Sequence, residues 1–188
     1  MLSLADGEKQ VLLEVARRAL HLAVERGESL ENLPHNVNLA QPAGAFVTLR
    51  QKNRLRGCIG RLESGDSLIS VVAYCARAAA SEDPRFRPVS ASELSEIAIE
   101  LSILSPLEDI ALEQIEVGRH GLLVTTESHR GVLLPQVAVE FRWSARTFLE
   151  ETCVKAGLDR MAWKQGGARI QAFTAESFSE LDFPRSSV

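Results

Sequence analysis

The same order of predicted elements occurs twice along the chain, and this repetition restricts the possible folds more than any other feature. Each half contains a β-hairpin, then a helix, then a strand. The pairs Arg56-Gly57 and Arg130-Gly131 occupy the same place in the second strand of each hairpin. Because few residues match between the halves, the element order carries the prediction of an internal duplication. Antiparallel hairpins with helices packed outside indicate an α+β fold.

The first half covers about residues 1–105. Apolar residues at spacings of three and four predict its first helix, with Ser3 as the cap and Gly27 as the left-handed end. A polar interval around the turn-forming Asn53 joins two extended stretches into a hairpin. The predicted elements are a helix over residues 3–27, strands at 45–49 and 54–59, a helix over 67–80, a short capped helix from 90 and a strand at 97–103.

The second half covers about residues 106–180 and is followed by a tail at 181–188. Its predicted elements are strands at 121–125 and 131–134, a helix over 144–156 that stops at Gly157, and a last strand containing Ile170 and Phe173. We therefore expect a single domain over residues 1–188, in which two similar halves share one mostly antiparallel sheet.

The charge and cysteine content exclude several classes of protein. A formal charge of −4 and an isoelectric point near 5.6 disfavour general attraction to nucleic acid or anionic membranes. No apolar run approaches the roughly 20 residues of a membrane span, and no signal-peptide pattern begins the chain, so we expect a cytoplasmic protein. Three widely separated cysteines predict reduced thiols. Metal-ligand spacings and nucleotide-binding motifs are absent, so neither a metal nor a cofactor is expected.

The hexapeptide LRGCIG at residues 55–60 is the candidate functional centre. Gly57 and Gly60 flank Cys58 with little side-chain bulk, which leaves room for a ligand or another backbone. Arg56 is expected on the same strand face as Cys58, where its guanidinium would lower the pKa of the thiol or bind a carboxylate or phosphate. The alternative is structural: the glycines serve a bulge or close packing, Cys58 is a small buried residue, and Arg56 pairs with an acid.

The loop Asp83-Pro84-Arg85-Phe86 places opposite charges around a rigid proline. Asp83 and Arg85 could form a wall of a binding site, because binding residues concentrate in loops. Alternatively, Asp83 caps a turn and Arg85 pairs with a local carboxylate.

Two residues of the second half are further candidates. His120, at the start of a predicted strand, is the candidate general base because imidazole exchanges protons near neutral pH. A histidine without an identifiable partner also fits a structural role. Gln136 follows a proline at the end of the second hairpin, and its amide can both donate and accept hydrogen bonds toward a cleft.

Six short segments occur in an order that resembles a known family. They are GAFVTL at residues 44–49, LRGCIG at 55–60, DPRF at 83–86, GRHG at 118–121, LLPQV at 133–137 and KAGL at 155–158. The chain resembles the AMMECR family, called AmmeMemoRadiSam system protein A in prokaryotes, from the first helix to about Phe178. The resemblance implies two repeats that share one barrel-like sheet, and an association with Memo-like and radical-SAM proteins.

Two functions from different classes fit these features. The first is a small enzyme or substrate-binding component of an AmmeMemoRadiSam-type system, with a cleft centred on the hexapeptide. Its catalytic residues would be Cys58 and His120, its substrate-binding residues Arg56, Asp83, Arg85 and Gln136, and its structural glycines Gly57 and Gly60. The second function is a non-catalytic interaction module that binds a protein or nucleic-acid partner.

Overall fold

A computed structural model describes residues 4–183 of the 188-residue chain. Its internal contacts form two compact units: the N-terminal unit, residues 4–104 with 176–183, and the C-terminal unit, residues 105–175. The hydrogen-bonded strand order is β2-β1-β3-β7-β5-β6, with β4 beside β7. The described strand pairings are antiparallel. The α+β class and the mostly antiparallel sheet expected from the sequence are therefore confirmed.

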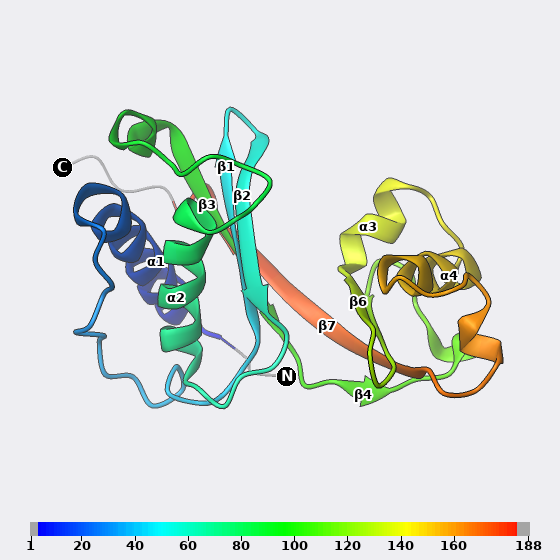
Figure 1. The fold of residues 1–188 in the computed structure, drawn as a ribbon. Helices are drawn as coiled ribbons and strands as arrows, with labels where there is room; N and C mark the ends of the chain where they lie inside the picture. Colours follow the sequence, from blue (N-terminus) through cyan, green and yellow to red (C-terminus); the bar gives the residue numbers. More distant parts are fainter. Residues whose placement is uncertain (1–3, 184–188) are drawn as a thin grey trace. The chain divides into compact units, whose positions relative to one another are not determined.

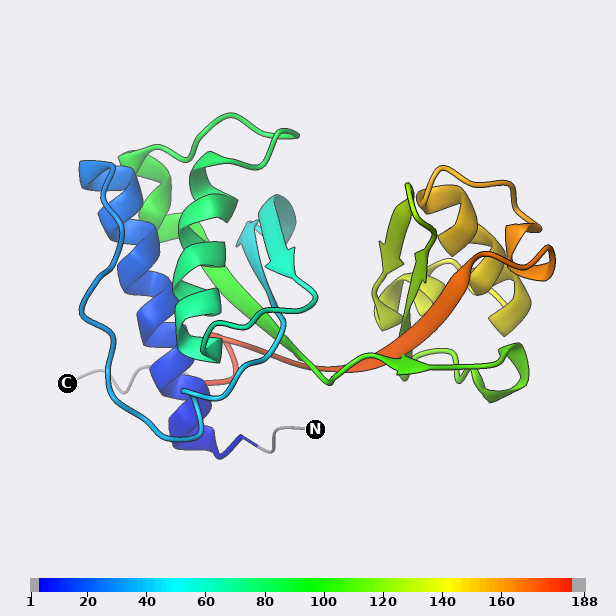
Figure 2. The ribbon, with the colours of Figure 1, turned by 60° about the horizontal axis from the view of Figure 1, so that its bottom comes forward.

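Helices α1 and α2 of the N-terminal unit lie side by side on one face of the strands β1, β2 and β3 (Figures 1 and 2). Alternate strand residues such as Val47, Leu49 and Ile99 are fully buried beneath the helices, as the period of two requires. The elements are α1 (Asp6–Arg26), β1 (Ala45–Gln51), β2 (Arg54–Arg61), α2 (Leu68–Ser81), a 3-10 turn η1 (Ala91–Glu96) and β3 (Ile97–Leu104).

The ends of two elements show how local chemistry sets them. The hairpin turn places both Lys52 and Asn53 at positive φ, 51° and 60°, which is the geometry that suits a two-residue hairpin loop. Gly27 ends α1 at φ 69°, as predicted. The predicted start of that helix is wrong: α1 begins at Asp6, where the Glu8 carboxylate accepts the Ala5 backbone N–H at 2.9 Å. Ser3 itself lies outside the described residues.

Helix α4 covers the core of the C-terminal unit, where Phe148, Leu149 and Cys153 are fully buried as predicted. Helix α3 was not predicted from the sequence, because Pro135 was interpreted only as the end of the hairpin. Pro135 is instead the first residue of this helix. The elements are β4 (Glu108–Asp109), η2 (Leu112–Gln114), β5 (His120–Thr125), β6 (Arg130–Leu133), α3 (Pro135–Glu140), α4 (Ala145–Lys155), η3 (Ala162–Lys164) and β7 (Arg169–Ser179).

Strand β7 contributes to both units. As far as Thr174 it pairs with β5, and it also pairs with the short strand β4. Its last residues belong to the N-terminal unit, where the Ser177 hydroxyl lies 2.8 Å from the Ser102 hydroxyl of β3.

The two units repeat one packing device beneath the helix that follows each hairpin. A Cβ at Gly57 would lie 2.2 Å from the carbonyl oxygen of Ala79 at the end of α2. A Cβ at Gly131 would lie 2.3 Å from the nitrogen of Ala156 at the end of α4. Each helix therefore approaches its hairpin through a glycine at the position that the two Arg-Gly pairs share. No helix within residues 4–183 is long and apolar enough to cross a membrane.

Candidate functional site

Arg56 is the extra residue of a β-bulge. The strand register shifts so that Leu49 faces Gly57 while Arg50 faces Leu55, which leaves Arg56 without a partner on β1. The two-residue turn pairs Gln51 with Arg54, and an unbroken hairpin would continue to place Cys58 opposite Val47 on the buried face. The bulge instead brings Cys58 opposite Thr48, on the other face of the sheet.

The guanidinium of Arg56 is engaged inside the protein. Its Nε and Nη2 donate to the two carboxylate oxygens of Glu93 at 2.8 and 3.2 Å. Its Nη1 and Nη2 also donate to the backbone carbonyls of Arg87 and Pro88 at 3.0 and 3.2 Å. The side chain is 11% exposed. The hydrogen bonds from Arg56 lower the pKa of Glu93 to about 2. Arg56 thus anchors the bulge to η1 and to the segment before it.

Charged side chains complete the outer edge of β2 at Cys58. Strand β2 is the last strand on its side of the sheet, so backbone groups that point away from β1 have no neighbouring strand. The Asp83 carboxylate accepts the Cys58 N–H at 2.8 Å, and the Arg85 guanidinium donates to the Cys58 carbonyl at 3.2 Å. The DPRF loop therefore replaces a neighbouring strand at this position.

Asp83 and Arg85 also bind each other. Asp83 Oδ1 accepts from the Arg85 backbone N–H at 3.1 Å and from its Nε at 2.9 Å, and Oδ2 accepts from Nη2 at 2.7 Å. The Asp83 side chain is 2% exposed, whereas that of Arg85 is 55% exposed. Hydrogen bonds from Arg85, and a further one from the Cys58 backbone, hold the pKa of Asp83 at about 2. The structural alternative for the loop is therefore observed, because Asp83 caps the turn and pairs with Arg85. A role for the exposed Arg85 in the wall of a binding site stays a prediction.

The Cys58 thiol is half-buried on the face of the sheet away from the helices. Burial raises its pKa above the ordinary value of 9.0, although a hydrogen bond from Thr48 and the charge of Arg85 act in the opposite direction. The Thr48 hydroxyl donates to the Cys58 sulfur at 3.3 Å. The expected lowering of this pKa by Arg56 is not found, since the bulge directs that guanidinium to Glu93.

Polar side chains continue from Cys58 across the next two strands. Thr48 of β1 lies opposite Cys58, and Glu100 of β3 lies opposite Thr48. Glu100 accepts a hydrogen bond from Arg50 at 2.8 Å. We call this surface, made of Thr48, Arg50, Cys58 and Glu100, the polar sheet face. None of its members except Cys58 was a candidate from the sequence, because the bulge that aligns them is a tertiary feature.

Three further hexapeptide residues serve packing, whereas Leu55 is 40% exposed. Gly57 admits the end of α2, as described above, and Ile59 packs against the core of the N-terminal unit. Gly60 lies beneath the ring of Phe46, whose nearest atom would be 2.2 Å from a Cβ at that position. In the C-terminal unit, the ring of Phe173 lies over Gly121 in the same way, at 2.4 Å.

His120 and Gln136 belong to the C-terminal unit, whereas the other candidate residues belong to the N-terminal unit. His120 Nδ1 accepts the backbone N–H of Glu116 at 3.1 Å, and the residue lines a pocket of about 410 Å³. Gln136 is exposed near the start of α3. Among the candidate residues predicted from the sequence, the structure brings Cys58, Asp83 and Arg85 into direct contact. Within residues 4–183 no group of three or more His, Cys, Asp or Glu side chains could hold a metal ion.

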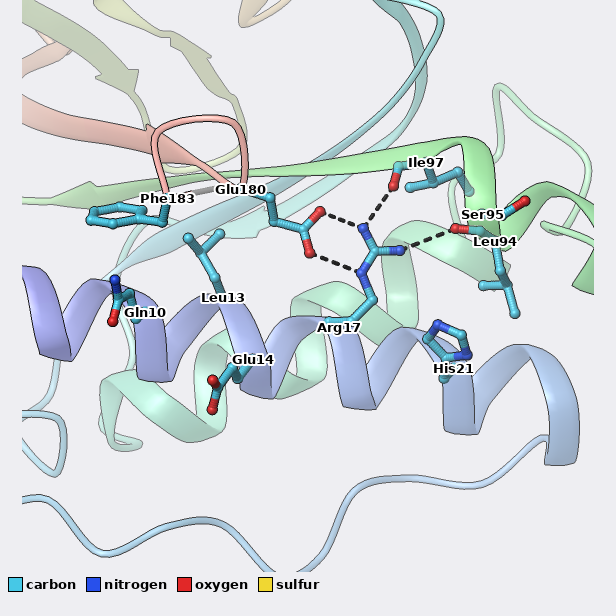
Figure 3. A pocket seen from close by; sticks show the side chains of 10 residues that line it. All are labelled: Gln10, Leu13, Glu14, Arg17, His21, Leu94, Ser95, Ile97, Glu180 and Phe183. Carbon is cyan, nitrogen blue, oxygen red and sulfur yellow. Dashed lines mark hydrogen bonds and ion pairs between the residues drawn. The ribbon is translucent and has the colours of Figure 1, made fainter. Parts of the chain in front are cut away.

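A cavity of about 600 Å³ in the N-terminal unit contains no hexapeptide residue (Figure 3). Arg17 crosses it and binds the Glu180 carboxylate, and it donates to the carbonyls of Ile97 at 2.6 Å and Leu94 at 3.2 Å. All three guanidinium nitrogens donate to these partners, so Arg17 ties α1 to the start of β3 and to Glu180 near the end of the described chain. Sequence reasoning missed this pair because 163 positions separate Arg17 from Glu180.

Comparison with known proteins places these features in a family context. The AMMECR1 family model matches residues 13–178. Protein MK0488 of Methanopyrus kandleri is 39% identical over 189 residues, which cover 95% of this chain and 90% of that protein. A protein of Methanothermobacter thermautotrophicus is 40% identical, covering 94% of this chain and 96% of its own length. The crystal structure of the uncharacterized protein PH0010 from Pyrococcus horikoshii matches with a TM-score of 0.82 and 37% identity over 89% of each chain.

Proposed function

The chain belongs to the AMMECR1 family, and within that family we propose that it is a substrate-binding component. Its ligand is a small polar molecule, held without a covalent bond on the polar sheet face at Cys58. The single observation that carries this proposal is that the hexapeptide residues differ in their contacts. Arg56, Gly57, Ile59 and Gly60 serve pairing and packing, whereas the Cys58 thiol is directed to a surface that no helix of its unit covers.

The state of the thiol favours binding over nucleophilic attack. A cysteine nucleophile reacts as the thiolate, and a raised pKa keeps Cys58 protonated at neutral pH. The Thr48 hydroxyl donates to the Cys58 sulfur, and the Arg85 guanidinium also interacts with this thiol; neither group is a base at this pH. A protonated thiol beside a hydroxyl instead offers weak hydrogen bonds and a soft, polarisable contact.

The charges around Cys58 indicate the class of ligand. Arg50 is paired with Glu100 on the polar sheet face, and Arg85 is paired with Asp83 at the strand edge. Each pair is neutral overall, so the surface supplies donors and acceptors without a strong field of one sign. A ligand with several hydrogen-bonding groups and little net charge fits it better than a phosphate or a polyanion.

The family resemblance supports the setting of this activity. We include Memo-like and radical-SAM proteins of the same cytoplasmic system as partners in the proposal, with the ligand passing between them and this protein. Purifying the protein from cells with and without the radical-SAM partner provides the check. Retention of one small molecule in both preparations at the same level would contradict that link.

The experiment on the site itself uses small-molecule extracts. The folded protein is incubated with a cell extract and washed, and the retained molecules are identified by mass spectrometry. Cys58→Ser keeps the size of the side chain and is expected to retain the ligand, with affinity changed by less than about tenfold. Cys58→Phe fills the surface and is expected to lose it. Val37→Phe adds the same ring at a highly exposed position and should bind like the wild type.

The outcomes separate the functions. A stable mass increase of the wild-type protein that disappears in Cys58→Ser would show covalent chemistry and contradict the proposal. Equal retention by Cys58→Phe would place the ligand elsewhere. The alternative of a macromolecular interaction module centred on the hexapeptide has less support, because Arg56 and Ile59 are engaged inside the unit and the two glycines offer no side chains to a partner.

A further inference from the structure

The turn between α3 and α4 presents an aromatic ring to solvent. Phe141 is 60% exposed, although burial of a phenylalanine is normally favourable. Its ring stacks on that of Trp143, with centroids 4.9 Å apart and planes inclined by 17°. One ring face is therefore covered by Trp143, and a further planar group could continue the stack on the outer side.

The backbone holds this ring pair in place at an energetic cost. Arg142, between the two aromatic residues, has a φ of 54°, in the left-handed region that residues other than glycine rarely adopt. The turn is closed by hydrogen bonds from the Arg142 N–H to Val139 at 3.1 Å and from the Trp143 N–H to Ala138 at 2.9 Å. These bonds fix the backbone that carries the two rings.

The charges beside the rings are not internally compensated. Arg142 and Arg146 are exposed, and neither forms an ion pair with any residue from 4 to 183. Glu140 is the acidic residue of the same segment, so its net charge is positive. By contrast, the exposed arginines Arg119, Arg160 and Arg169 are each paired with a carboxylate. The local charge therefore differs in sign from the chain as a whole.

From this combination we infer a binding platform for single-stranded nucleic acid on the turn of residues 141–146. A base stacks on the outer face of Phe141, and the guanidinium groups of Arg142 and Arg146 contact flanking phosphates. Stacking on an exposed aromatic is the sequence-independent mode by which proteins hold single strands, and guanidinium groups supply the backbone contacts. With the whole chain at −4, stacking must provide much of the affinity. This platform lies in the C-terminal unit and is independent of the proposed site at Cys58.

The test measures fluorescence anisotropy of a labelled deoxythymidine oligomer of about 12 nucleotides, a length in the range that single-strand sites occupy. Phe141→Ala removes the stacking surface and should weaken binding about tenfold. Arg142→Asn combined with Arg146→Gln should make the slope of log affinity against log salt concentration less steep by roughly 1.4. Each phosphate contact contributes about 0.7 to that slope on single strands. Asparagine tolerates the left-handed conformation, so the ring pair stays in place.

A matched control removes two arginines elsewhere. Arg18→Gln with Arg26→Gln lowers the net charge equally on α1 of the N-terminal unit and should leave the affinity unchanged. Equal losses in both double variants, or wild-type binding by Phe141→Ala, would overturn the platform in favour of general charge attraction. Absence of wild-type binding at low salt would overturn the platform outright. Equal competition by thymidine monophosphate would show a nucleotide site instead of a strand site.

Discussion

The guanidinium of Arg56 and the carboxylate of Glu93 form a two-bond ion pair, at 2.8 and 3.2 Å, that anchors the bulge in β2. This contact matters beyond its own energy because the bulge decides which face of the sheet Cys58 occupies. The pair therefore couples a structural anchor to the orientation of the candidate functional thiol.

Arg56→Lys tests that anchor. A lysine cannot make the paired bonds to Glu93 while also reaching the carbonyls of Arg87 and Pro88, so the free energy of unfolding should fall by about 2 kcal/mol in urea denaturation. Arg50→Lys is the control, because Arg50 contacts Glu100 from a more exposed position and should cost less than about 0.5 kcal/mol. Equal losses for the two variants would contradict the role of Arg56.

Asp83→Asn tests the edge of β2. The amide cannot serve the Cys58 N–H and the Arg85 guanidinium as the buried carboxylate does, so a stability loss of about 2 kcal/mol is expected. Asp66→Asn makes the same change at a carboxylate that is 63% exposed and bound to Arg61. Thermal unfolding should show a shift of several degrees for Asp83→Asn and almost none for Asp66→Asn.

The loss of stability at acid pH should depend on the protonation of Asp83 and Glu93. Their folded pKa values of about 2 lie below the ordinary values of 3.8 and 4.5. Groups with lowered pKa values add stability that is complete above the unfolded pKa and is lost as the pH falls toward the folded one. Protonation of each carboxylate should therefore lower the free energy of unfolding by roughly 2 kcal/mol between about pH 5 and pH 2. Glu93→Gln should flatten the unfolding free energy against pH in this window, and an unchanged slope would refute the assignment.

The reactivity of Cys58 follows from its raised pKa. Alkylation by iodoacetamide in the native protein should be slow at pH 7, with a rate midpoint above pH 9. Thr48→Val removes a hydrogen bond that favours the thiolate, so the midpoint should rise further. Cys75 and Cys153 are fully buried and should stay unmodified, which mass spectrometry of the labelled peptides can verify. A midpoint near neutral pH would instead support Cys58 as a catalytic nucleophile.

The repeated glycines provide a test of the structural duplication. Gly57→Ala and Gly131→Ala each force a methyl group against the backbone of the covering helix, and each should cost about 2 to 3 kcal/mol. Gly65→Ala serves as the control, because no atom lies within 4 Å of a Cβ there and its φ is not positive. Its stability should stay within about 0.5 kcal/mol of the wild type. If either Gly57→Ala or Gly131→Ala left the stability unchanged, the two units would not share this packing.

Local chemistry explains why most elements were predictable from the sequence. The hairpin at Asn53, the left-handed end at Gly27 and the buried face of α4 each depend on residues a few positions apart. Helix α3 was missed because Pro135 can both end a strand and begin a helix, and periodicity over six residues cannot separate the two. The start of α1 was misplaced because the Glu8 carboxylate acts as the cap from inside the helix.

The sequence by itself determined the α+β class, the repeated element order and the position of the hexapeptide, because these are encoded in hydrophobic period and turn residues. Only the tertiary structure decided which face of the sheet each hexapeptide residue occupies and what it contacts. A single bulge reverses the faces of all later strand residues, since side chains alternate with a period of two. That bulge depends on Arg56 meeting Glu93, 37 positions away, and on the DPRF loop meeting the edge at Cys58. Such contacts arise only when the chain is folded.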